Sequence, residues 1–138
     1  MRVGYSFSVL RYVHDPVTEE FVNVGVADFS PEARYVRAIC TTSCGRIRRM
    51  FQGVDGSHIL QLAHYIQDRI CASGLEYESG LAIEQLLSKV LPADDSALQF
   101  SKAGVGLSAD LDRTLNELFQ RHVELYTVEA FAEEVSAN

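Results

Sequence analysis

The chain has 138 residues, of which 47% are hydrophobic and 22% are charged, and its formal net charge is -7. This length suits one domain with one core, and no apolar run approaches the roughly 20 residues that a membrane-spanning helix needs. The acidic balance disfavours non-specific binding to nucleic acid or to anionic lipid.

The first third of the sequence has the pattern of β-strands. Between residues 5 and 13 successive side chains alternate with a period of two, and we expect the face that carries Arg11 to be the core face. Residues 15–16, Asp-Pro, end this run, and a second β-rich run at 21–29 forms an antiparallel hairpin with it. A third run at 35–41 completes a predicted meander.

The second half changes to a helical period. Apolar residues at steps of three and four predict a helix over 57–73, with Ser57 as its cap. A shorter helix is expected at 83–90, a strand at 97–102, and a third helix from Ser108 to residue 125.

These elements predict an α+β fold in which an antiparallel meander of three to four strands packs against about three helices. We expect a single domain over residues 1–138. Residues 1–42 form its β-rich part, 43–126 are mainly helical, and 127–138 make a tail.

Two motifs are weak candidates for binding sites. The glycine-rich segment 103–108 precedes a helix but lacks the third glycine of a dinucleotide loop and the lysine of a P-loop, so it predicts a plain turn. Four residues could in principle bind zinc, but their spacing is poor for a structural site. They are Cys40, Cys44, His58 and His64. We therefore predict neither a metal nor a cofactor.

The three cysteines are an odd number, which argues against a disulfide framework and favours a reducing compartment. With no export signal at the N-terminus, we expect a cytoplasmic protein.

Cys44 lies in a turn before Arg46, and a neighbouring positive charge makes a thiol more reactive. A partner base would come from one of the four histidines, His122 among them, but no signature identifies one, so catalysis is the weakest hypothesis.

Positive charge gathers in the first part of the chain. Residues 1–51 hold seven Arg or Lys against five Asp or Glu, and no acid lies between Glu32 and Asp55. The arginines concerned are Arg34, Arg37, Arg46, Arg48 and Arg49. They could bind phosphates or an acidic protein surface, or could pair with acids of the second half of the chain.

One stretch resembles a known family. Residues 5–16, YSFSVLRYVHDP, and 20–26, EFVNVGV, are similar to the opening hairpin of a bacterial family, domain of unknown function 3037. The resemblance implies that Arg11, Glu20, Asn23 and Gly25 belong to the family motif. Family members are often encoded beside HipA-like kinases, so it also implies a protein partner in a toxin–antitoxin-like pair.

Arg11 and Asn23 each lie on a face that is otherwise apolar. A buried polar group without a partner costs about 1–3 kcal/mol, so we expect the two to pair with each other or with Glu20. The alternative is a ligand or partner site that opens onto the sheet. Gly25 suggests a bulge or a close backbone approach.

A non-enzymatic protein-binding module is the leading hypothesis, and nucleic-acid binding through residues 34–49 is the alternative.

Overall fold

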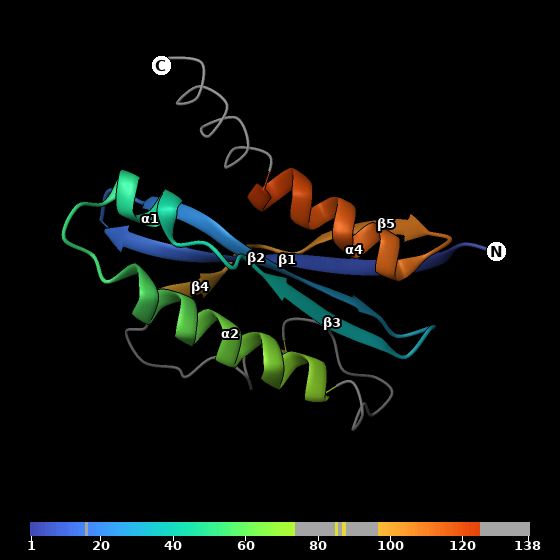
Figure 1. The fold of residues 1–138 in the computed structure, drawn as a ribbon. Helices are drawn as coiled ribbons and strands as arrows, with labels where there is room; N and C mark the ends of the chain where they lie inside the picture. Colours follow the sequence, from blue (N-terminus) through green and yellow to red (C-terminus); the bar gives the residue numbers. More distant parts are fainter. Residues whose placement is uncertain (16, 74–84, 86, 88–96, 125–138) are drawn as a thin grey trace, which may run out of the picture.

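An antiparallel sheet forms the centre of the molecule in the computed structural model, which describes residues 1–15, 17–73, 85, 87 and 97–124 (Figure 1). The strands are β1 (Val3–Asp15), β2 (Glu20–Ser30), β3 (Tyr35–Cys40), β4 (Leu98–Phe100) and β5 (Gly104–Ser108). The helices are α1 (Gly45–Met50), α2 (Gly56–Ser73), α4 (Leu111–Phe119) and the π-helix η2 (Gln120–Glu124). The predicted α+β fold is confirmed. None of the described helices is long and apolar enough to cross a membrane.

The strand order is β3-β2-β1, and β4 and β5 share the free side of β1. β5 pairs with Val3–Phe7, and β4 pairs with Leu10–Tyr12. Between them the backbone N–H of Ser101 donates to the Val9 carbonyl at 2.8 Å, and the Ser101 hydroxyl accepts from the Val9 N–H at 2.9 Å. The segment 98–108 therefore follows one edge of the sheet with a short interruption.

Helices cover both faces of the sheet, with α2 on one side and α4 on the other (Figure 1). The larger core lies between the sheet and α2 and includes Leu10 and Tyr12 of β1. A smaller core lies on the α4 side and includes Val26, Leu115 and Val123. The expectation that the Arg11 face is the main core face was wrong. Because helices cover both faces of the sheet, the alternation of side chains along β1 does not indicate which face is more deeply buried.

Residues 104–108 of the glycine-rich segment form strand β5, and the prediction of a plain turn was wrong. Gly104 and Gly106 lie against the aromatic rings of Phe7 and Tyr5, and a Cβ on either glycine would come within 2.5 Å of a ring atom or ring hydroxyl. Because glycine has no side chain, this edge strand can pass directly over the two large rings.

The helix boundaries differ by one to three residues from the prediction. α2 begins at Gly56, and Asp55, not Ser57, accepts the N–H of His58 at 3.2 Å. α4 begins at Leu111, because the Asp110 carboxylate caps it by accepting the N–H of Arg113 at 3.2 Å. The predicted helix at 83–90 and the tail at 127–138 lie almost entirely outside the described residues.

Candidate functional site

The motif hairpin of β1 and β2 contains a bulge that sets the positions of its polar residues. Leu10 is opposite Gly25, whereas the next residue, Arg11, is opposite Asn23, so Val24 is the extra residue. A Cβ on Gly25 would lie 2.6 Å from the sulfur of Cys40 and 2.9 Å from the carbonyl oxygen of Ile39. Gly25 predicts a bulge or a close backbone approach, and the hairpin has both, with Val24 as the bulged residue.

Arg11 is half-buried, and its guanidinium forms no salt bridge with any residue that the structure describes. Its guanidinium carbon lies 4.2 Å from the centre of the Phe21 ring, a cation–π geometry. Its Nε is buried and has no hydrogen-bond partner among the described residues. Burying a cation unpaired is costly, so this group is unusual for a residue whose role is purely structural.

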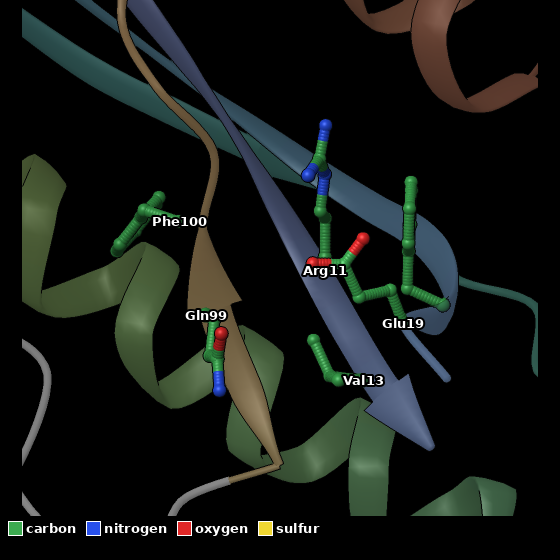
Figure 2. Close-up of a pocket in the computed structure, with 6 residues that line it drawn as sticks. Arg11, Val13, Glu19, Gln99 and Phe100 are labelled. Atoms are coloured by element: carbon green, nitrogen blue, oxygen red, sulfur yellow. The ribbon is translucent and has the colours of Figure 1, made fainter. Parts of the chain in front are cut away.

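A pocket of about 210 Å³ opens beside this guanidinium. Figure 2 shows the Arg11 side chain rising from β1, with Gln99 on the neighbouring β4 and Glu19 from the β1–β2 turn. The lining residues are Arg11, Val13, Glu19, Phe21, Gln99 and Phe100. The pocket thus combines one guanidinium, one carboxylate and one amide with apolar side chains.

Asn23 bonds to η2 and not to Arg11. Its side-chain Nδ2 donates to the backbone carbonyl of His122 in η2 at 3.0 Å, while its Oδ1 is buried without a partner among the described residues. Glu20 is exposed at the start of β2, opposite Asp15. The expected Arg11–Glu20–Asn23 network is therefore not formed, because η2 takes the Asn23 amide and the strand register keeps Glu20 at the hairpin end.

His122 links this site to the smaller core. Its ring packs against Phe7 with 5.5 Å between ring centres. Burial lowers the pKa of His122, and the charges of Arg121 and Arg11 act in the same direction. The positive charge of Arg11 thus disfavours protonation of His122, and an imidazole supplies no negative charge to the guanidinium.

A sequence profile of the family described as "Protein of unknown function (DUF3037)" matches residues 7–123. The chain belongs to this family. The match extends far beyond the hairpin that suggested it: it contains the whole Arg11 pocket and continues to η2, whose carbonyl binds Asn23. No curated protein and no solved structure matches the chain. Membership in DUF3037 names no activity.

The five candidate arginines of this DUF3037 protein lie at two ends of the sheet (Figure 1). Arg34 is in the β2–β3 turn, and nearby Arg37 pairs with Asp112 at 3.6 Å, with both side chains exposed. Arg46, on α1 at the other end, donates to the Val123 carbonyl at 3.1 Å. Arg48 and Arg49 lie on the same short helix. The arginines that the sequence groups together do not gather on one surface.

The candidate cysteine and zinc residues each contact other groups of the fold. Cys44 precedes α1 and packs against Gly56, whereas Cys40 is buried and its thiol contacts the Ala63 carbonyl at 3.4 Å. Burial raises the pKa of the Cys40 thiol to about 12. His64 bonds to the Thr41 carbonyl at 3.0 Å. Within the described residues no three His, Cys, Asp or Glu side chains converge as a metal site would require.

Asp28 is a buried acid that the sequence reasoning missed. One carboxylate oxygen accepts the N–H of Phe29 at 2.9 Å, and the other has no partner among the described residues. Burial raises the pKa of Asp28 to about 7, and the hydrogen bond from Phe29 opposes this only in part. The available signal was an acid within the otherwise apolar run of β2.

Proposed function

We propose that this DUF3037 protein is a protein-binding module that accepts a strand of its partner along β5. The observation that carries the proposal is a pair of apolar side chains on an edge strand, Val105 and Leu107, which are 81% and 69% exposed. Isolated exposed apolar residues are common, but two on one face of an edge strand form a small ladder of side-chain sites.

The outer side of β5 can supply main-chain hydrogen bonds. β5 pairs with β1 and with no other described strand, so its second row of N–H and C=O groups faces away from the sheet. An extended segment placed there would bond to these groups, and its apolar side chains would contact Val105 and Leu107. The occupant is therefore an extended, partly apolar segment of another protein.

The candidate partner comes from the family resemblance. Because DUF3037 members are often encoded beside HipA-like kinases, a neighbouring kinase of that type is the protein to test first, as part of a toxin–antitoxin-like pair. Nucleic-acid binding has less support, since the arginines lie at two ends of the sheet rather than on one contiguous basic face.

The test is co-purification of the tagged chain with the neighbouring kinase, with and without nuclease. We expect a complex that survives nuclease and is weakened about tenfold or more by Val105→Glu with Leu107→Glu, because a charge in each site blocks apolar contact. Val17→Glu, at a position 89% exposed in the β1–β2 turn, is the matched control and should bind as the wild type does. Loss of the complex on nuclease treatment, or full binding by the double variant, would overturn the proposal.

A further inference from the structure

We propose that the pocket beside Arg11 binds a carboxylate group, either of a small free molecule or of an acidic residue or chain end of a partner. This site lies on β1, β2 and β4, apart from the exposed residues of β5, and does not depend on the proposed function.

The Arg11 guanidinium is positioned by an aromatic ring. It is fixed by stacking on Phe21 at 4.2 Å, so its orientation is set before any ligand arrives. Its buried Nε has no partner among the described residues, and the acids that lie near it in sequence do not pair with it. A preorganised donor fork of this kind is what binds a planar anion through two parallel hydrogen bonds.

The charge of the pocket favours a carboxylate over a phosphate. Arg11 is the only cation among the lining residues that the structure describes, and Glu19 places a negative charge in the same pocket. A phosphate carries up to two charges and is usually held by several cations or by backbone amides. A carboxylate carries one charge, which a single guanidinium can match.

The volume limits the size of the group. A pocket of about 210 Å³ is smaller than the roughly 300–1,000 Å³ of sites for drug-sized ligands, so it suits one side chain or a molecule of similar size. Gln99, directly opposite Arg11 in the β1–β4 register, can contribute an amide hydrogen bond from the facing wall. Val13 and Phe21 offer apolar contact to a short carbon chain.

The test is a titration of the full chain followed by the NMR signal of the Arg11 Nε–H group, at constant ionic strength. The probes are sodium acetate and sodium glutamate for free carboxylates, and two blocked tripeptides, Gly-Glu-Gly and Gly-Gln-Gly, for a side chain of a partner. An unblocked triglycine carboxylate tests a chain end. We expect a saturable shift with at least one carboxylate probe and none with Gly-Gln-Gly or with sodium chloride.

Two variants separate binding from folding. Arg11→Lys keeps the charge but removes the planar fork, and the probe-induced shifts of neighbouring amides should disappear. Gln99→Glu leaves Arg11 in place but puts a competing carboxylate opposite it, at an exposed position that tolerates the change. It should abolish the shift. Arg37→Lys, which alters an exposed arginine outside the pocket, is the matched control and should respond as the wild type does.

The probe that saturates at the lowest concentration identifies the source of the carboxylate. Sodium phosphate producing the same saturable shift would overturn the assignment to a carboxylate. The absence of any shift, or a full response by a folded Gln99→Glu variant, would overturn the site.

Discussion

Replacing the buried acid Asp28 by asparagine should change how the stability of this protein depends on pH. Asparagine has almost the same shape, stays neutral, and keeps an oxygen that can accept the N–H of Phe29. Because burial raises the pKa of Asp28 from 3.8 to about 7, the folded protein holds a proton there that the unfolded chain releases.

Proton linkage determines whether Asp28 raises or lowers the free energy of unfolding as the pH changes. Between about pH 4 and pH 7 the native state binds more protons at Asp28 than the unfolded state, so this residue lowers the free energy of unfolding as pH rises. Its full contribution to stability is present below pH 3.8 and is lost by about pH 7. At 1.36 kcal/mol per pH unit the upper limit is about 4 kcal/mol, and local hydration of the carboxylate should reduce the measured value to about 2 kcal/mol.

The assay is urea unfolding followed by circular dichroism from about pH 4 to about pH 8, comparing Asp28→Asn with the wild type. The difference in unfolding free energy should rise in favour of the variant across this range and level off above it. Val26→Ala, a destabilised variant of the same strand with no titratable change, should differ from the wild type by an amount independent of pH. If the difference in unfolding free energy between Asp28→Asn and the wild type did not change with pH, the raised pKa of a buried Asp28 would be refuted.

Three further predictions concern the fold. Gly25→Ala should cost about 1–3 kcal/mol in urea unfolding because its Cβ would meet Cys40 and Ile39, whereas Gly4→Ala, with open space around it, should change little; equal effects would contradict the close approach. Asp110→Ala should lose about 1 kcal/mol of stability with the α4 cap, and Asp110→Asn should restore most of it. Thiol labelling should show exposed Cys71 reacting in a fast phase that Cys71→Ser removes, while buried Cys40 reacts only on unfolding; fast labelling of Cys40 would contradict its burial.

The elements that sequence predicts well here are those whose signal is local. The hairpin of β1 and β2 follows from a period of two interrupted by Asp15-Pro16, and α2 follows from a stripe of apolar residues at helical spacing. β5 could not be predicted in this way, since its glycines are explained by two rings that are about a hundred residues away in the chain. The same holds for Asn23, whose partner is a carbonyl of η2, 99 residues further on.

The placement of Arg11 illustrates why a site can be suspected from sequence and still not be built from it. Acids are close by in the chain, so nothing in the composition predicts an unpaired guanidinium. The β1–β2 register contains two shifts, at Leu10/Arg11 and at Val13/Asp15, and between them Arg11 is opposite Asn23. Without these shifts Arg11 would face Val24.

The two compensating shifts enclose only three residue pairs, and two of the six residues concerned, Arg11 and Phe21, form the stacked pair that walls the pocket. Glu20 lies beyond the second shift, where it is exposed and opposite Asp15. An uninterrupted ladder would be the simpler way to stabilise this hairpin, since each bulge leaves a residue out of the pairing. Irregularities that bring Phe21 opposite Val13, on the face of the sheet where the Arg11 guanidinium stacks on its ring, are better explained by a binding site than by the needs of the fold.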